Sequence, residues 1–358
     1  MFSFYDISNS IHQWLSSQMG STAVMLIEMA IVGVLAISLF AFLGLLLVYM
    51  ERKVAAFMQL RLGPNRVGWK GTLQTLADTI KLLFKEGFSP DASDKFLFNF
   101  APILVIVVAM LLLAPIPFAK GFQIYDINIG VFYISAVSSI GVIGILMAGW
   151  SSNNKYSLLG AMRSGAQIVS YELSAGLSLV VIVAFSGSMS LTQIVQSQAD
   201  GWWIFKGHIP AMIAFVIFII AGTAELNRAP FDFAEAESEL TAGFHTEYTG
   251  MRFAMFFLAE YINMFIMAAV GATLFLGGWM PLHFGNLSGF NHIMDFIPHI
   301  VWFMGKTFFL IFVLMWFRWT FPRLRIDQLL TLEWKYLMPI SLFNLLLVAL
   351  VVIKGWHF

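Results

Sequence analysis

The feature that most constrains this chain is a series of eight apolar runs, each long enough to cross a lipid bilayer. A spanning helix needs roughly 17–25 apolar residues. The runs cover about 22–49, 97–118, 128–150, 157–186, 209–226, 253–277, 298–317 and 337–353. Only 11% of the residues are charged, against about 25% in an ordinary soluble domain. The sequence therefore predicts an all-α polytopic membrane helix bundle, with one integral membrane domain over residues 1–358.

The distribution of lysine and arginine predicts how the bundle is oriented. We assign 16 of the 20 basic residues to the side of the loops after spans 1, 3, 5 and 7, counting Arg163 near the start of the run 157–186, and three to the other side. Basic loops stay on the cytoplasmic side, so both termini are expected outside. Loops 51–96, 227–252 and 318–336 are then cytoplasmic. We expect the inner membrane of a bacterium, with the mitochondrial inner membrane as the less favoured location.

Composition excludes several kinds of site. The chain has no cysteine, so it cannot bind an iron–sulfur cluster through thiolates. Its formal net charge of zero gives no general attraction to nucleic acid. By the predicted topology only His245 among the 7 histidines is cytoplasmic, and none lies deep in a span. We therefore predict that this chain itself binds no metal and no cofactor.

The first cytoplasmic loop is predicted to be folded. Gly63-Pro64-Asn65 marks a turn. Apolar residues recur at helical spacing from Thr72 to Glu86, and Gly87 is placed to end that helix. An amphipathic helix here would lie in the membrane interface or pack on a partner protein. Glycines 33 and 44, and glycines 141 and 144, are predicted to be helix-packing positions.

The segment from Glu225 to Glu247 concentrates acids beside the membrane. It holds six acids and a single base, Arg228, and has a net charge of −5. Loops 51–96 and 318–335 have net charges of +3 and +2, so the three sums cancel. We expect these loops to fold against one another, and the expected partners of the acids are Arg52, Arg61, Arg318 or Arg325.

Ionisable residues within the spans are candidates for function, because burying them in lipid is unfavourable. Glu172 and Glu260 lie well inside spans 4 and 6, and Glu225 closes span 5. On three helices, these glutamates could form a ladder that relays protons from the acidic segment into the membrane. Lys306 and Glu28 also fall within spans. For each of these ionisable residues, the alternative to a functional role is a buried ion pair or a side chain that reaches to the membrane surface.

Two long motifs resemble one known family. They are Glu51-Arg-Lys-Val-Ala-Ala-Phe-Met-Gln-Leu-Arg-Leu-Gly-Pro-Asn-Arg-Val-Gly and Ala224-Glu-Leu-Asn-Arg-Ala-Pro-Phe-Asp. Shorter matches follow in order, at Ser170-Tyr171-Glu172, Glu235-Ala-Glu-Ser-Glu-Leu, Glu247-Tyr248, Ala259-Glu260-Tyr261 and Pro322-Arg-Leu-Arg-Ile-Asp-Gln. They resemble the quinone-site membrane subunit of respiratory complex I, the proton-pumping NADH:quinone oxidoreductase.

The resemblance implies a role within a larger enzyme. The chain would form much of a quinone tunnel and couple quinone reduction to proton translocation, with no complete active site of its own. The tunnel residues carry over to Glu51, Arg52, Arg61, Asp232, Glu235, Glu237, Glu239 and Arg318, and the proton path to Glu247, Glu225, Glu172 and Glu260. Lys306 also matches a family lysine. The partners are the other complex I subunits, which hold NADH, FMN and the iron–sulfur clusters, together with the lipid bilayer.

Three other readings stay open at this point. A homologous subunit of a membrane-bound hydrogenase-type ion pump would share these motifs without using quinone. A free-standing secondary transporter is disfavoured, because the sequence shows no inverted repeat. A purely structural anchor would not need the intramembrane glutamates. Sequence does not distinguish ubiquinone from menaquinone as the substrate.

Overall fold

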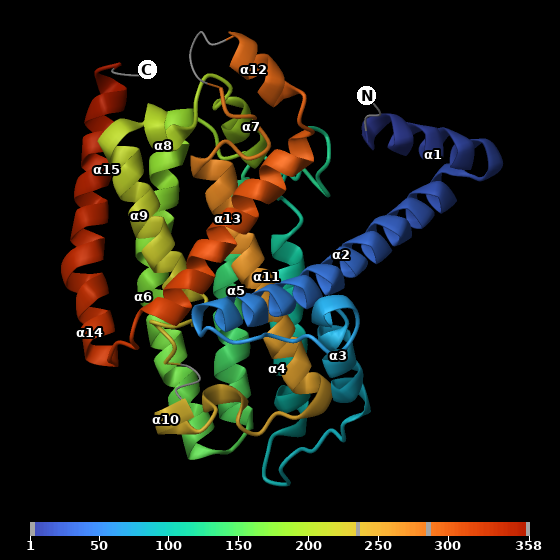
Figure 1. Cartoon of the computed structure of the whole chain (residues 1–358), viewed down its shortest axis with the longest axis vertical. Coiled ribbons are helices and arrows are strands. Elements are labelled where there is room, and N and C mark those ends of the chain that lie inside the picture. The colour runs from blue at the N-terminus through green and yellow to red at the C-terminus, as the bar shows by residue number, and fades with distance from the viewer. Residues whose placement is uncertain (1–3, 234–236, 284–287, 356–358) are drawn as a thin grey trace.

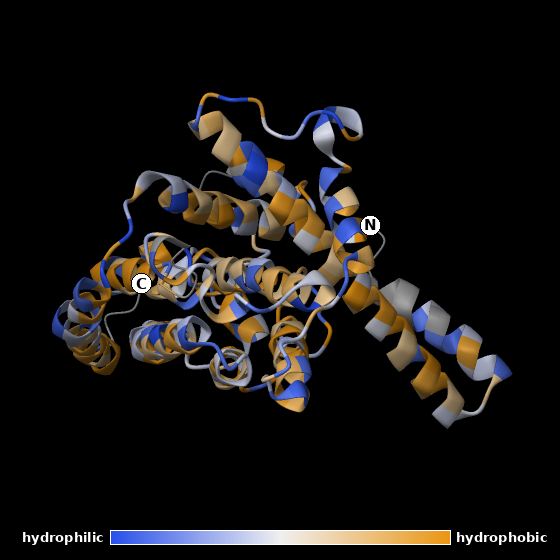
Figure 2. Ribbon diagram, turned by 90° about the horizontal axis from the view of Figure 1, so that it is seen from below, coloured by the Kyte–Doolittle hydropathy of each residue, from blue (hydrophilic) through white to orange (hydrophobic). Residues whose placement is uncertain are grey.

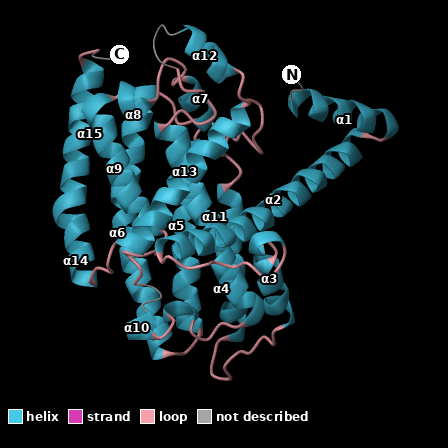
Figure 3. Cartoon of the chain, viewed as in Figure 1, coloured by secondary structure: helices cyan, strands magenta, loops and turns pink. Residues whose placement is uncertain are grey.

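The chain folds into a bundle of long helices (Figures 1 and 3). The computed structural model describes residues 4–233, 237–283 and 288–355. Within these ranges eight helices are long and apolar enough to cross a membrane, which confirms the predicted fold class. They are α2 (Ser21–Met58), α4 (Lys95–Leu112), α5 (Gly130–Ser151), α6 (Lys155–Ser186), α9 (His208–Glu225), α11 (Gly250–Phe275), α13 (His299–Thr320) and the continuous helix Ile326–Ile353.

Shorter helices lie at the two ends of the bundle. They are α1 (Phe4–Gln18), α3 (Gln74–Phe84), α7 (Leu191–Gln196), α8 (Trp203–Lys206), α10 (Glu237–Leu240) and α12 (Ser288–Asp295), with 3-10 turns at Trp69–Gly71 and Gly243–His245. We call the end with α3 and α10 the basic end, because its loops carry most of the lysine and arginine. The opposite end carries α1, α7, α8, α12 and the C-terminus (Figure 1).

Local sequence sets the helix ends. Asp94 accepts hydrogen bonds from the backbone N–H groups of Phe96 and Leu97 at the start of α4, and Asn154 caps α6 in the same way. The helix α4 ends at Leu112, six residues before the predicted limit of 118, and Pro115 and Pro117 follow within five residues. Proline lacks the N–H that helix continuation needs.

The last spanning helix also differs from expectation. Residues 318–336 were expected to form a loop, but α13 continues to Thr320 and a new helix begins at Ile326. It consists of α14 (Ile326–Thr331), a π-helical turn at Leu332–Leu337 and α15 (Met338–Ile353). Only the short segment between Thr320 and Ile326 is irregular, so this loop is smaller than its polar sequence suggested.

Close helix contacts require a small residue at two of the four predicted glycines, Gly44 and Gly144. An added Cβ would come 2.1 Å from Leu258 at Gly44 and 2.4 Å from Val105 at Gly144. At Gly141 it would lie at an ordinary 3.6 Å from Val108. The prediction is wrong for Gly33, where a Cβ would meet nothing within 4 Å. Gly33 lies in the half of α2 that leaves the bundle.

The helix α2 crosses the bundle obliquely and then leaves it (Figures 1 and 2). Its C-terminal half packs against the core through Phe40, Leu43 and Leu47. Its N-terminal half carries a run of exposed apolar residues from Met25 to Ile37. The helix therefore joins the core of the bundle to a distant point on the opposite end.

The predicted amphipathic helix is present as α3, although it ends at Phe84 and not at Gly87. Its apolar positions Leu76, Ile80 and Leu83 are all exposed, as is Leu73 just before it. Thr75, on another face, is buried. The apolar face therefore points away from this chain, as an interfacial or partner-bound helix requires.

Candidate functional site

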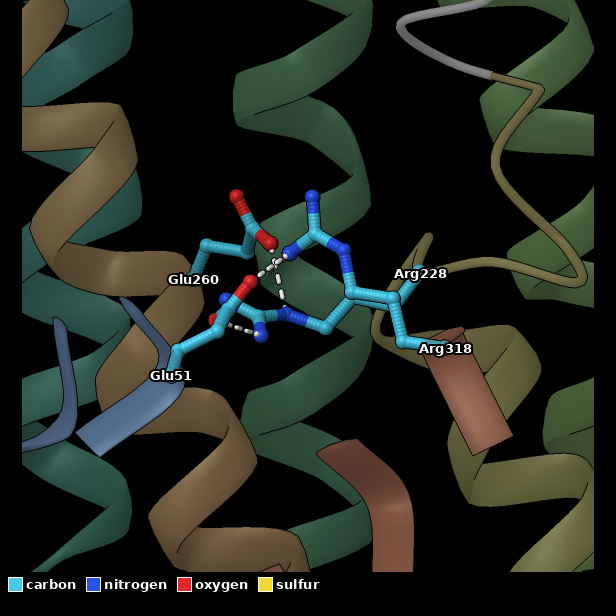
Figure 4. Close-up of polar contacts among 4 residues, drawn as sticks. All are labelled: Glu51, Arg228, Glu260 and Arg318. Atoms are coloured by element: carbon cyan, nitrogen blue, oxygen red, sulfur yellow. Dashed lines mark hydrogen bonds and ion pairs between the residues drawn. The ribbon is translucent and has the colours of Figure 1, made fainter. Parts of the chain in front are cut away.

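Four charged residues from four parts of the chain meet at one point (Figure 4). Arg228, in the acidic segment, donates from Nη1 to Glu51 of α2 at 2.5 Å and from Nε to Glu260 of α11 at 2.7 Å. Arg318, near the end of α13, pairs with the other carboxylate oxygen of Glu51. We call Glu51, Arg228, Glu260 and Arg318 the charge cluster.

Arg228 is the centre of the charge cluster. Its side chain is 4% exposed, and its guanidinium lies 4.3 Å from the centre of the Tyr261 ring. Burial opposes the positive charge, but the attraction of Glu51 and Glu260 outweighs burial and raises the pKa of Arg228. The cluster therefore holds a fixed cation between two carboxylates.

The backbone around Arg228 is fixed by α6. Gln167 donates from one amide nitrogen to the carbonyls of Ala224 at 2.7 Å and Phe231 at 2.8 Å. Phe231 is buried and its ring lies 5.6 Å from that of Tyr171. The bond between Ala229 and Pro230 is cis. These contacts fold the acidic segment onto the bundle, so it is not a solvated loop.

A first cavity of about 500 Å³ opens beside the charge cluster at the basic end. Its wall includes Glu51, together with two residues, Arg52 and Arg61, that the sequence also placed in the quinone tunnel. The remaining lining residues are Ala55, Leu62, Gly63, Pro64, Tyr261 and Trp319. The wall thus combines arginines, a carboxylate and two aromatic rings, which suits a flat molecule with polar atoms.

A second, more enclosed cavity of about 150 Å³ lies among the helices. Glu172, Glu225 and Glu260, the three members of the predicted ladder, all line it. Ser138, Asn263 and His245 add polar groups, while most of the wall is apolar. Ser139 donates a short hydrogen bond to Glu172. The structure therefore brings the three glutamates of α6, α9 and α11 to one interior space.

The charge cluster connects the two cavities. Glu51 lines the first cavity, Glu260 lines the second, and Arg228 binds both carboxylates. A single guanidinium therefore links a carboxylate of the first cavity to a carboxylate of the second.

His245 lines the second cavity from the acidic segment. Burial lowers the pKa of His245 to about 4. The imidazole is therefore neutral at neutral pH, and it can accept or donate a hydrogen bond there without adding charge.

The expected partners of the acids are only partly right. Arg52 pairs with Asp78 of its own loop at 2.5 Å, and Arg61 donates to Gln59 at 2.6 Å. The prediction that these two arginines face the acidic segment is wrong in the structure. Opposite net charges indicated that the loops meet, but they could not say which side chains do.

The contacts to the acidic segment come from other arginines. Arg323 binds Asp232 at 3.0 Å, and Arg163 of α6 binds Glu239 at 2.7 Å. Arg325, the fourth expected partner, lies near Asp327 of its own segment at 3.4 Å. Arg318 is the one expected arginine that joins the charge cluster, through Glu51 of the first loop motif.

The remaining predicted residues are dispersed. Glu247 accepts a hydrogen bond from Asn154 at 2.6 Å and does not line either cavity. Glu235 lies outside the described residues, and the side chain of Glu237 is also outside them. The structure thus describes the surroundings of ten of the twelve residues that the resemblance implied, and the functional roles of all twelve stay predictions.

Lys306 and Glu28 lie far from the charge cluster, toward the opposite end. The ammonium of Lys306 donates to the backbone carbonyls of Gly278 at 3.0 Å and Met280 at 2.7 Å, and it lies 4.4 Å from the Trp202 ring. It therefore satisfies carbonyls just beyond the end of α11. Glu28 binds His12 of α1 at 2.8 Å.

Two residues of interest were not among the predicted site residues. Arg228 was noted only as the single base among six acids, and that isolation was the signal that could have singled it out. Glu333 is 1% exposed and accepts a hydrogen bond from Ser174 of α6. The sequence does not single out Glu333, because residue 333 falls in the predicted loop 318–336, where an acidic residue is expected.

No group of three or more metal-ligating side chains occurs within the described ranges. The four members of the charge cluster already neutralise one another, so they leave no free set of carboxylates for a cation. The chemistry that the site offers is the binding of a polar head and the movement of protons.

Comparison with known proteins finds one matching family and several relatives that are similar over most or all of the chain. A family model described as NADH dehydrogenase matches residues 29–349. The chain is 60% identical to the H subunit of the NADH-quinone oxidoreductase of Bacteroides fragilis and 59% identical to that of Bacteroides thetaiotaomicron, over the full length of both chains in each case. It is 52% identical to the corresponding protein of Brevibacillus brevis over 85% of this chain and 87% of the relative.

Proposed function

The chain belongs to the NADH dehydrogenase family and is a membrane subunit of an NADH-quinone oxidoreductase, and from that premise we propose what its two cavities do. The first cavity receives the quinone headgroup. The second is part of a proton path, and the charge cluster couples the two. The name shared by these relatives favours the quinone enzyme over the hydrogenase-type pump and the transporter.

The observation that carries this proposal is the position of Arg228 between the cavities. A quinone needs a cavity with polar groups at its head, and proton transfer needs carboxylates in an interior space. Arg228 binds one carboxylate from each cavity, at 2.5 and 2.7 Å. If Arg228 only stabilised the fold, one salt bridge, to Glu51 or to Glu260, would be sufficient.

The chemistry of quinone reduction explains why such a link is useful. A quinone that accepts two electrons binds two protons to become a quinol. Negative charge therefore develops on the quinone oxygens beside Glu51, Arg52 and Arg61 before protons arrive. The same field acts on Arg228, and the proton occupancy of Glu260 depends on how firmly Arg228 holds it. Reduction of the quinone would thus change the local electrostatic field and, through it, the proton occupancy of Glu260 in the second cavity.

Within the second cavity the proposed relay runs through Glu260, Glu225 and Glu172. The hydroxyl of Ser139 and the neutral imidazole of His245 are the adjacent groups that can pass or orient a proton. Glu247 would extend the path toward the basic end, where it contacts Asn154. Asp232, Glu239 and Arg318 are not among the described lining residues of the first cavity, so their role at the headgroup, like that of Glu235 and Glu237, rests on the resemblance alone.

We further propose that the basic end faces the cytoplasm and binds the hydrophilic arm of the complex. NADH, FMN and the iron–sulfur clusters then belong to partner subunits, and the chain contributes no electron carrier. The exposed apolar face of α3 would contact the membrane interface or a partner subunit. The bacterial inner membrane is the expected location.

Replacing Glu260 with Gln in the assembled complex tests this proposal. The amide keeps the shape and one acceptor for Arg228 but cannot carry a proton. Proton transfer by a positioned group contributes roughly 10²–10⁴-fold, so we expect coupled quinone reduction and proton pumping in liposomes to fall by at least the lower figure. NADH oxidation by an artificial acceptor should persist, because it needs only the hydrophilic arm.

Asp327→Asn is the matched control, because Asp327 is an exposed acid at the same end of the bundle. It should leave all three activities unchanged. If the assembled Glu260→Gln complex pumps protons at the rate of the control, Glu260 is not part of the path and the proposed link through Arg228 is wrong. A parallel loss of all three activities would instead show that the residue holds the complex together.

A further inference from the structure

The N-terminal helix α1 is a part of the chain that the proposed function does not use. Residues 1–28 precede the segment that the family model matches, and they include α1 and the first turns of α2. In Figure 1, α1 lies almost across the long axis of the bundle, at the same end as α7, α8 and α12. A spanning helix would run along that axis, so α1 has the direction of a helix that lies in a membrane surface.

The described side chains of α1 are mostly polar and uncharged, with one large exposed aromatic residue, Trp14. Asp6 is its only acid, and it has no lysine or arginine. Trp14 is 66% exposed, and Gln13 and Ser16 are exposed polar residues on other sides of the helix. Tryptophan is enriched at membrane–water interfaces, where its ring and its N–H suit the two sides of the boundary.

The neighbouring part of α2 indicates what lies beside α1. Between Met25 and Ile37 the exposed apolar side chains occur at positions 25, 26, 29, 31, 32, 34, 35 and 37, which cover every face of the helix. A helix that is apolar all round is surrounded by lipid or by protein. Figures 1 and 2 both show this half of α2 projecting from the bundle. Since this apolar part of α2 begins directly after α1, α1 lies at the edge of the apolar surroundings of α2.

The apolar part of α2 is longer than the hydrocarbon is thick, so this helix must tilt and its outer end must be held in place. The apolar run 22–49 is about 42 Å long at roughly 1.5 Å per residue, whereas the hydrocarbon is about 30 Å thick. Tilting accommodates the excess, and these lengths correspond to a tilt of about 44°, in keeping with the oblique path of α2 in Figure 1. At the inner end, Glu51 is fixed by Arg228 and Arg318. The outer end has α1, which the contact of His12 with Glu28 at 2.8 Å ties to α2.

We propose that α1 is an interfacial helix that rests on the lipid headgroups at the opposite end of the bundle, with Trp14 toward the hydrocarbon, and that it anchors the outer end of the tilted α2. The partner is a lipid surface and not another protein. Because α1 has no basic residue, the attraction comes from apolar burial and not from anionic lipid. The proposal rests on the proposed function only for which leaflet is involved.

The absence of cysteine from this chain makes a direct test possible. Single cysteines are introduced at Gln13 and Trp14, and the assembled complex is kept in native membranes of intact cells. A charged, membrane-impermeant maleimide is added outside, and a polyethylene-glycol maleimide then shifts the mass of every chain that was not blocked. Cysteines of partner subunits do not shift this chain, so the background is zero.

We expect Gln13→Cys to react readily with the charged reagent, and Trp14→Cys to react several-fold more slowly. An uncharged, lipid-soluble maleimide should block Trp14→Cys and remove that difference. Gln18→Cys lies one turn further along the stripe of Trp14 and repeats the measurement if Trp14→Cys lowers the yield of the complex.

Three results would overturn the proposal. Equal reaction of both positions with the charged reagent would place α1 free in water. Protection of Trp14→Cys from both reagents would place it against a partner protein. Reaction of Gln13→Cys only after the charged reagent is admitted to the cytoplasm would overturn the assignment of α1 to the outer leaflet, without affecting the proposed link between the two cavities.

Discussion

Removing the positive charge of Arg228 is the perturbation that examines the charge cluster most directly. Arg228→Met keeps a long side chain of similar reach but removes two ion pairs. Glu51 retains Arg318, whereas Glu260 forms no other ion pair among the residues described. The loss therefore corresponds to one uncompensated buried carboxylate and not to two.

The size of the effect follows from burial. Breaking a buried pair by removing one partner costs roughly 3–5 kcal/mol. The side chain of Glu260 is 23% exposed, and it faces a cavity, so the lower figure applies. Because about 1.4 kcal/mol is a tenfold change in an equilibrium, the substitution should shift the folding equilibrium by roughly 10²-fold. We expect a clear fall in complex yield and in the thermal transition of this subunit.

Two further variants separate charge from packing. Arg325→Ala removes an exposed arginine at the same end, and an exposed pair is worth only about 0–1 kcal/mol. The double variant Arg228→Met with Glu260→Met removes both buried charges, so much of the stability should return. Quinone reduction should stay low in the double variant, because the proposed link is absent. If Arg228→Met alone assembles with normal stability and activity, the charge cluster is not what couples the cavities.

Three other substitutions follow from the same contacts. Arg61→Ala should raise the Michaelis constant for a short-chain quinone without lowering complex yield, since Arg61 lines the first cavity and is exposed; an unchanged constant would remove it from the headgroup site. Lys306→Met should lower thermal stability but keep the ratio of protons pumped to quinone reduced, because among the described residues Lys306 contacts backbone carbonyls and aromatic rings and no carboxylate; a changed ratio would argue for a role in proton transfer. For His245 the pKa in the folded chain, about 4, is below the usual value of 6.5, so the unfolded chain binds the proton first and stability should fall as pH drops from about 6.5 toward 4. His245→Phe should flatten that part of the pH profile of thermal stability, and an unaltered profile would contradict the assignment.

Much of the fold could be predicted from hydropathy, because length and apolarity alone decide whether a segment can span a bilayer. Hydropathy could not locate the ends of the helices. The helix α4 stops before two prolines, although the apolar run continues to Phe118. Conversely, residues 326–336 are polar enough to predict a loop, but they lie in α14 and the π-helical turn that follows it, where Leu329 and Glu333 are buried. Tertiary packing overrides local polarity in both directions.

The candidate site was predictable as a set of residues and not as a set of contacts. Glu172, Glu225 and Glu260 stood out because each is a carboxylate at the level of the membrane. The pairing of Arg228 with Glu51, 177 residues away, depends on the rotation of α2 and on the path of the acidic segment. The net charges of the loops contain no information about the rotation of α2 or the path of the acidic segment. The same sums suggested Arg52 and Arg61 as partners, whereas local neighbours Asp78 and Gln59 occupy them.

The balance of charge in the cluster indicates why its location suits a coupling device. Two arginines and two carboxylates sum to zero, so a proton bound by Glu260 leaves the buried cluster with one positive charge. Under the proposed function, negative charge on a quinone in the first cavity would compensate that charge. Two unit charges roughly 8 Å apart interact by about 2 kcal/mol at an effective dielectric constant near 20, which exceeds a tenfold change in occupancy. Such coupling is reciprocal: in the proposed mechanism, a negatively charged quinone would favour the proton at Glu260, and that proton would favour the charged quinone by the same factor.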